Sequence, residues 1–280
     1  MTTRWAVSRL GNLGGKRIIV TGATNGVGLA TARSLAGAGA QVILAVRNIE
    51  LGKQRAAEMG GDTSVVKVDL ADQASVRAFP TLFDGDVDIL INNAGVVTQR
   101  RTETVDGFEA TLGTNFLGPF ALTNLLFPRV RSQIINVGSD AHKMASVALD
   151  DPHLRAGRWS ALSAYGRSKL AVMLWGLELD RRLRAAGSPV NTYLTHPGWV
   201  ASNLSNVTTT YVNLDFMTSF ITRVTEVAYG VNTYDADMDL ASGDKIYRLR
   251  EGVERFYITD INNPAASAKA QSTLAVMYDF

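Results

Sequence analysis

The stretch that decides the fold is "RIIVTGATNGVG", residues 17–28, in which an apolar run enters a glycine-rich turn. The run predicts a buried strand, and the pattern over 26–38 predicts a helix directly behind the turn. Gly22 would allow the tight turn, Gly26 would let the backbone approach a pyrophosphate, and Gly28 would let the helix pack closely. The helix N-terminus would then face the phosphates. This setting predicts a nucleotide-binding site, although a loop whose glycines serve only packing would have the same sequence pattern.

The alternation of strand and helix continues along the chain. Apolar runs and amphipathic segments follow one another without a Pro/Gly/Ser-rich linker or an internal repeat. This order is typical of βαβ units with right-handed crossovers. We therefore predict an α/β fold of the Rossmann type, a doubly wound, mostly parallel seven-stranded sheet with helices on both faces, in a single domain over 1–280. The expected strands are 17–21, 41–46, 64–69, 87–92, 133–137, 190–195 and 255–260, and the expected helices are 26–38, 48–59, 72–82, 104–131 and 161–186.

Composition excludes several classes of function. The chain has 280 residues, and its 28 basic and 26 acidic residues leave a net charge of only +2, which gives no nucleic-acid footprint. The absence of cysteine excludes thiolate metal sites and disulfides, and the three histidines are too dispersed to predict a metal site. The start lacks the apolar stretch of a secretory signal, and no run approaches the roughly 18 apolar residues of a membrane span. A cytoplasmic protein is expected.

A tyrosine and a lysine stand four residues apart in "SAYGRSKLA", residues 163–171. On a helix, Tyr165 and Lys169 would share one face. Eight Tyr and seven Lys in 280 residues give about 0.2 such pairs by chance, so this pair needs support from its surroundings. Rival chemistries lack their motifs, because the chain contains neither G-x-S-x-G nor G-x-x-x-x-G-K-[ST].

Landmarks in a defined order give that support. The turn reads T-G-x-x-x-G-x-G, and it is followed by "VDL" (68–70), "NNAG" (92–95), "TNFLG" (114–118), "NVGSDAH" (136–142), "YGRSK" (165–169) and "HPGWV" (196–200). Over roughly residues 15–200 the chain thus resembles the short-chain dehydrogenase/reductase family. The "AH" after the serine, the long gap from that serine to the tyrosine and "HPG" resemble its retinol-dehydrogenase-like subgroup.

The resemblance implies a catalytic set of Asn115, Ser139, Tyr165 and Lys169. Tyr165 would act as the acid/base, and the Lys169 ammonium, together with an oxidised nicotinamide, would lower the pKa of its phenol. Ser139 would hydrogen-bond the substrate oxygen, and Asn115 would help to hold a water that connects the lysine to solvent. Taken singly, each residue has a structural alternative: an amphipathic helix position, a loop cap, or an amide that satisfies backbone groups at a bend.

The end of the second strand distinguishes NAD(H) from NADP(H). An acid there would bind the ribose 2′-OH, whereas an arginine would bind a 2′-phosphate. The sequence "LAVRN" (44–48) places Arg47 at this point with no acid beside it, so we expect NADP(H) rather than NAD(H). A solvated arginine at a strand end is the alternative. By resemblance, the cofactor contacts are Gly22, Thr24, Asn25, Gly26, Val27, Gly28, Arg47, Asp69, Leu70, Asn93, Ala94, Gly95, Tyr165, Lys169, Pro197, Gly198, Val200 and Ser202.

The expected substrate wall is 198–225, which follows the sixth strand. Parallel α/β sheets bind ligands beyond the carboxyl ends of their strands, where this segment emerges. Its apolar side chains predict a hydrophobic ketone, aldehyde or alcohol, although packing of the segment on its own domain would need the same residues. Departures from the family pattern at Gly138 and Pro119 weaken any transfer of retinoid specificity. The candidate contacts are Trp199, Leu204, Tyr211, Leu214, Phe216, Met217 and Phe220.

The sequence therefore predicts an NADP(H)-dependent oxidoreductase that interconverts a carbonyl and an alcohol. No metal is expected, and the resemblance implies a homodimer or homotetramer. Two rivals stay open: an enzyme of this fold that catalyses a non-redox step such as cyclisation or epimerisation, and an NADP-binding regulator without turnover. The complete Ser–Tyr–Lys set argues against the regulator and leaves the first rival in place.

Overall fold

The computed structural model describes residues 11–146, 150–156, 158–197, 238–239 and 245–246. Its main element is a six-stranded parallel sheet in the order β3-β2-β1-β4-β5-β6. The strands are β1 (Arg17–Thr21), β2 (Gln41–Val46), β3 (Thr63–Lys67), β4 (Val87–Asn92), β5 (Val130–Val137) and β6 (Asn191–Thr195). A separate antiparallel pair joins β7 (Met238–Asp239) to β8 (Lys245–Ile246). The predicted Rossmann-type sheet is confirmed, and its expected seventh strand, 255–260, lies outside the described residues.

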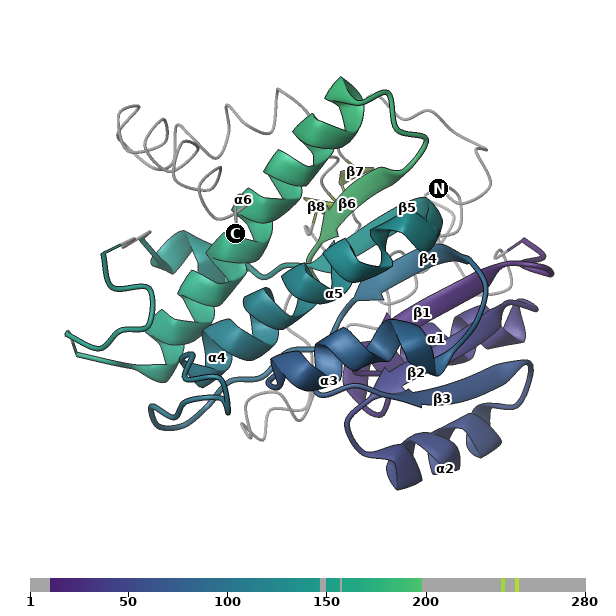
Figure 1. Cartoon of the computed structure of the whole chain (residues 1–280), viewed down its shortest axis with the longest axis horizontal. Helices are drawn as coiled ribbons and strands as arrows, with labels where there is room; N and C mark the ends of the chain where they lie inside the picture. Colours follow the sequence, from purple (N-terminus) through teal and green to yellow (C-terminus); the bar gives the residue numbers. More distant parts are fainter. Residues whose placement is uncertain (1–10, 147–149, 157, 198–237, 240–244, 247–280) are drawn as a thin grey trace.

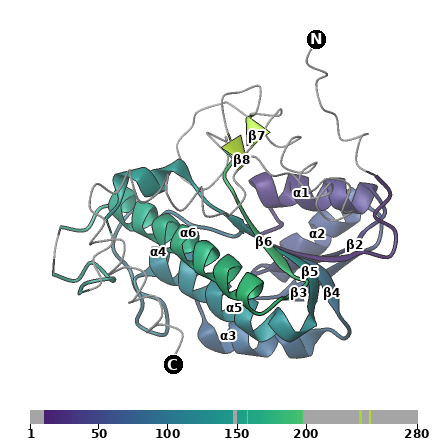
Figure 2. The ribbon, with the colours of Figure 1, turned by 90° about the horizontal axis from the view of Figure 1, so that it is seen from above.

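Helices cover both faces of this sheet (Figures 1 and 2). The helices α1 (Gly26–Gly37) and α2 (Ile49–Met59) pack on one face, and the helices α3 (Gln73–Ala78), α5 (Gly118–Leu126) and α6 (Ala161–Ala185) pack on the other. Alternate residues of each strand enter the two layers: Ile18 and Val20 point to the first, whereas Ile19 points to the second. Because both faces of the central strands β1, β2, β4 and β5 are buried, these strands need nearly continuous apolar runs, which made them recognisable in the sequence.

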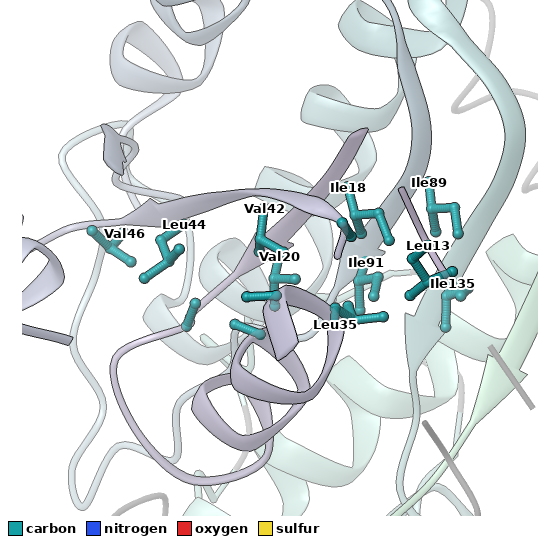
Figure 3. Packing of buried hydrophobic residues seen from close by; sticks show 14 of the residues in the cluster. Leu13, Ile18, Val20, Leu35, Val42, Leu44, Val46, Ile89, Ile91 and Ile135 are labelled. Atoms are coloured by element: carbon teal, nitrogen blue, oxygen red, sulfur yellow. The ribbon is translucent and has the colours of Figure 1, made fainter. Parts of the chain in front are cut away.

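One hydrophobic cluster fills the layer between the sheet and the helices α1 and α2. Figure 3 shows Leu35 of α1 among Val20, Val42 and Ile91 of three adjacent strands. Leu35 and these three strand residues are at most 1% exposed. Close packing of this kind holds the last turn of α1 firmly against the sheet.

The predicted helix 104–131 is wrong at both ends. The first helical residue is Ala110 of α4 (Ala110–Leu112), because Gly107 has a positive φ of 79° and a turn closes from Thr104 to Phe108. The helix continues through a π-turn, Gly113–Leu117, into α5 and a 3₁₀ turn, Phe127–Arg129, that contains Pro128. Residues 130 and 131 belong to β5 instead, so this strand begins three residues before the predicted start at 133.

The first residue of α5 sets how closely that helix approaches the sheet. A Cβ atom added to Gly118 would collide with the carbonyl oxygen of Leu70 and lie 2.9 Å from its Cβ. We therefore expect Gly118→Ala to lower the free energy of unfolding by about 1–3 kcal/mol, the usual cost of overpacking. Urea unfolding measures this, with Gly37→Ala as the matched control, because nothing lies within 4 Å of a Cβ there. Equal stabilities of the two variants would contradict the close approach.

Candidate active site

The glycine turn lies at the carboxyl edge of the sheet, between β1 and α1. Gly22 has a φ of 68°, and a Cβ on Gly28 would lie 2.5 Å from the Gly22 carbonyl oxygen and would collide with the Asn93 amide. The N-cap residue Asn25 makes no side-chain cap, so no side chain at that position satisfies the first N–H groups of α1. A helix N-terminus that retains its donors fits an anionic group such as a pyrophosphate.

The loop after β4 is tied to the same turn. The Thr21 hydroxyl accepts from the backbone N–H groups of Asn93 and Ala94, both at 3.0 Å. The Asn93 side chain donates to the Thr21 carbonyl at 2.9 Å. The order of the sheet reverses between β1 and β4, and such a switch point is where open α/β sheets bind ligands. The predicted contacts at 93–95 therefore lie beside those at 22–28.

The residues predicted to surround the adenosine lie after β2 and β3. Arg47 is exposed one residue beyond β2 and makes no hydrogen bond with any described residue. Glu50 forms an exposed ion pair with Lys53, as expected of a residue that faces water. The Asp69 carboxylate accepts from the backbone N–H of Ala71 at 3.0 Å and so closes a turn after β3.

The four predicted catalytic residues come from three segments that meet at this edge. Ser139 follows β5 and caps a 3₁₀ turn, Asp140–Met144, by accepting from the Ala141 N–H at 3.2 Å. Its hydroxyl also lies close enough to the phenol of Tyr165 on α6 to lower the pKa of that phenol. The Lys169 ammonium lies 5.8 Å from the centre of the Tyr165 ring. The structure thus brings Ser139, Tyr165 and Lys169 together.

Burial governs the protonation of this set. Lys169 is 4% exposed, and burial lowers its pKa to about 8, while its Nζ donates to the Val137 carbonyl at 2.7 Å. Burial raises the pKa of the Tyr165 phenol, and the Ser139 hydrogen bond opposes this rise. The expected lowering of the tyrosine pKa is therefore absent from the protein alone, because desolvation of the phenolate outweighs the Ser139 hydrogen bond.

Asn115 lies in the π-turn and joins two parts of the site. Its Oδ1 accepts from the Val96 N–H at 2.7 Å, and its Nδ2 donates to the Val96 carbonyl at 2.9 Å and to Ser168 Oγ at 3.0 Å. The Ser168 hydroxyl in turn donates to the Tyr165 carbonyl at 2.7 Å. The side chain of Asn115 therefore holds the loop after β4 to α6. Single π-turns are frequent at functional sites.

A small pocket opens beside Ser139 between β5, β6 and α6. Sequence reasoning missed that His142 and His196 both line it, because their separation along the chain hides the pairing of β5 with β6. The Ser139 carbonyl accepts from the ring Nδ1–H of His142 at 2.7 Å, and burial lowers the pKa of this histidine. The "AH" after the serine was the available signal. The lining residues are Gly138, Ser139, Asp140, His142, Met173, Leu194, Thr195 and His196.

The remaining predicted contacts fall mostly outside the described residues. Pro197 is half-buried after β6 and is the last described residue before the proposed substrate wall. The segment 198–225 lies outside, with Gly198, Trp199, Val200, Ser202, Leu204, Tyr211, Leu214, Phe216, Met217 and Phe220. Among the described residues no group of three or more His, Asp or Glu side chains could hold a metal ion. No described helix has both the length and the apolar character needed to cross a bilayer.

Comparison with known proteins identifies the family. The sequence model of the short chain dehydrogenases matches residues 16–211. Human retinol dehydrogenase 12 is 42% identical over 204 residues, which are 69% of this chain and 64% of the relative. Mouse polyprenol dehydrogenase is 42% identical over 206 residues, which are 68% of this chain and 61% of the relative. An uncharacterized protein from Mycobacterium paratuberculosis has a crystal structure that matches with a TM-score of 0.72 and 39% identity, covering 84% of this chain and 82% of that one.

The chain therefore belongs to the short-chain dehydrogenase/reductase family, a family of oxidoreductases that bind a nicotinamide cofactor. Its resemblance to the retinol-dehydrogenase-like subgroup is confirmed. The chain spans somewhat more than three fifths of the length of the curated relatives it matches, 61% of one and 64% of the other.

Proposed function

We propose that this protein is an NADP(H)-dependent oxidoreductase that interconverts a hydrophobic ketone or aldehyde and the corresponding alcohol. The observation that carries the proposal is the meeting of Ser139, Tyr165 and Lys169 at the carboxyl edge of the sheet. The same edge carries the turn at 22–28, whose glycines leave room for a close ligand and whose helix N-terminus retains donors. A bound nicotinamide cofactor would supply or accept the hydride.

Ser139 and Tyr165 would handle the substrate oxygen. In the reduction, the Ser139 hydroxyl would hydrogen-bond the carbonyl oxygen, where negative charge develops. The Tyr165 phenol would donate its proton to the same oxygen. The phenol is protonated at neutral pH, as a proton donor must be, but burial raises its pKa and so makes it a weaker acid. In the reverse direction the phenolate is needed, and it is disfavoured by the same burial.

Lys169 would supply the charge that makes the phenolate accessible. At neutral pH a group with a pKa of about 8 is mostly protonated, so the ammonium places a positive charge near the phenol. Its hydrogen bond to Val137 holds it beneath the end of β5. Because that pKa is close to neutrality, Lys169 could also pass a proton between the phenol and solvent. The water contact of Asn115 expected from the family stays a prediction.

Arg47 supports NADP(H) as the cofactor. The residue lies at the end of β2, where the substituent on the adenosine ribose is read, and its guanidinium is exposed and available for a 2′-phosphate. We expect Arg47→Ala to weaken NADPH binding by about 10- to 100-fold, the range of a charge-assisted contact, and to leave NADH binding almost unchanged. Fluorescence titration with the two cofactors measures both constants. Equal losses would mean that Arg47 does not read the phosphate.

The decisive experiment is turnover. Purified protein should oxidise NADPH when it is given a hydrophobic aldehyde or ketone and should form the matching alcohol in equal amount. The apolar substrate class rests on the composition of 198–225 and on the names of the relatives. A homo-oligomeric state, a cytoplasmic location and a single domain stay predictions from the sequence.

A further inference from the structure

The second turn of α2 places a cation against the glycine turn. Arg55 Nε donates to the carbonyl oxygen of Thr24 at 3.3 Å, which reaches across from one βα unit to the next. Its side chain is 27% exposed, so the guanidinium lies at the rim of the turn. Ile49, Ala56 and Met59 of the same helix pack on the core and hold α2 in place. The position of Arg55 is therefore determined by the fold.

Glu58 binds one of the nitrogen atoms of this guanidinium. The Nη1 atom of Arg55 lies 3.0 Å and 2.7 Å from the two carboxylate oxygens of Glu58, one turn further along the helix. Gln54 donates to the same carboxylate at 2.9 Å. The Nη2 atom of Arg55 donates to no acceptor among the described residues. Arg55 thus keeps donors for another anion, while Glu58 offsets its charge.

Arg47 and Arg55 flank the same corner of the sheet. The parallel register pairs Thr21 of β1 with Ala45 of β2, so the turn after β1 and the residues after β2 emerge side by side. The first turn of α1 carries no acidic residue. A ligand bound along the glycine turn would therefore lie near Arg47, which follows β2, and near Arg55, which contacts the turn after β1. This corner is where the ribose 2′ substituent lies in doubly wound folds.

We propose that Arg55 is a specificity-determining residue that binds the 2′-phosphate of NADP(H) together with Arg47, and that Glu58 competes with this phosphate for the Arg55 guanidinium. The inference rests on the NADP(H) cofactor of the proposed function. NADH lacks the 2′-phosphate and leaves the Arg55–Glu58 pair undisturbed. The contact between Arg55 and the 2′-phosphate therefore strengthens the binding of NADP(H) alone and so discriminates between the two cofactors.

The test is a set of dissociation constants for NADPH and NADH, measured by nicotinamide fluorescence on wild type and five variants, of which Arg47→Ala is one. Arg55→Ala should weaken NADPH by about tenfold or more, and NADH by less than about twofold. Glu58→Gln should tighten NADPH by about two- to fivefold, because the competing charge is removed. Arg55→Lys keeps the charge without the fork and should lie between wild type and Arg55→Ala.

Lys53→Ala is the matched control. It removes a cation from the same helix, but Lys53 is 63% exposed, pairs with Glu50, and faces another direction than Arg55. Its NADPH and NADH constants should both stay within about twofold of wild type, so a general charge effect is excluded by this variant.

Each other outcome would contradict one defined part of the proposal. Equal weakening of both cofactors by Arg55→Ala would overturn the inference, since Arg55 would then only shape the turn. No effect of Arg55→Ala, beside an NADPH-selective loss in Arg47→Ala, would overturn the inference and leave the proposed cofactor intact. An unchanged NADPH constant in Glu58→Gln would overturn the competition. Wild-type protein that binds NADH at least as tightly as NADPH would overturn the proposed cofactor itself.

Discussion

Replacing Tyr165 by Phe is expected to lower kcat by about 10²- to 10⁴-fold, the usual contribution of a positioned acid/base. Phenylalanine keeps the ring that packs in the half-buried site and removes only the hydroxyl that contacts Ser139. Because the loss falls on the proton transfer, KM and the NADPH dissociation constant should change much less than kcat. Steady-state kinetics with the best carbonyl substrate measures the split.

Tyr193→Phe provides the matched control for this change. Tyr193 lies on β6, partly buried against the core under α1, and it does not line the pocket beside Ser139. The same loss of a hydroxyl should leave kcat within about threefold there, because no reacting group is removed. Near-normal turnover of Tyr165→Phe would remove Tyr165 from the catalytic set.

Replacing Lys169 by Met is expected to abolish most of the activity and yet to stabilise the fold. The ammonium that favours the phenolate is lost, so kcat should fall by about 10²-fold or more. The lowering of the Lys169 pKa from 10.5 to about 8 corresponds to a desolvation penalty of about 3 kcal/mol on the charged form at neutral pH. Loss of the charge-assisted hydrogen bond to Val137 offsets about 2 kcal/mol of this, which leaves a net gain of about 1 kcal/mol.

The pH dependence of that gain has a defined sign. The folded pKa of Lys169 lies below its unfolded value, so the unfolded chain binds more protons between about pH 8 and pH 10.5. The stability of wild type relative to Lys169→Met therefore rises through this window and is constant below it. Urea unfolding at pH 7 and at pH 10 measures the difference, with exposed Lys53→Met as control. A variant less stable than wild type at pH 7 would contradict the burial penalty.

Much of the fold could be predicted because its central strands are buried on both faces. Runs such as "RIIVT" and "VDILIN" are typical of buried strands. Because the carboxyl ends of parallel strands lie at one edge of the sheet, the strand order alone predicts that Arg47, Asn93 and Ser139 lie at that edge. The helix boundary near Ala110 was missed, because the glycine at 107 and the turn that it closes interrupt an otherwise helical pattern.

The finer geometry of the site could not be predicted, because it depends on which helix faces meet. Nothing in the spacing shows that Arg55 points back to Thr24, or that Asn115 reaches Ser168. The direction of the Tyr165 pKa also depends on burial, which is a property of the packed site. A motif names the residues of such a site, whereas packing determines their protonation.

The most direct test of the account follows NADPH absorbance and product formation together, with a panel of hydrophobic aldehydes, ketones and quinones. Wild type should consume NADPH faster than NADH and form one alcohol for each NADPH lost, and Tyr165→Phe should do so far more slowly. A changed product without loss of NADPH would contradict this account and point to a cyclase or epimerase. Tight NADPH binding with neither change would contradict it in favour of a regulator.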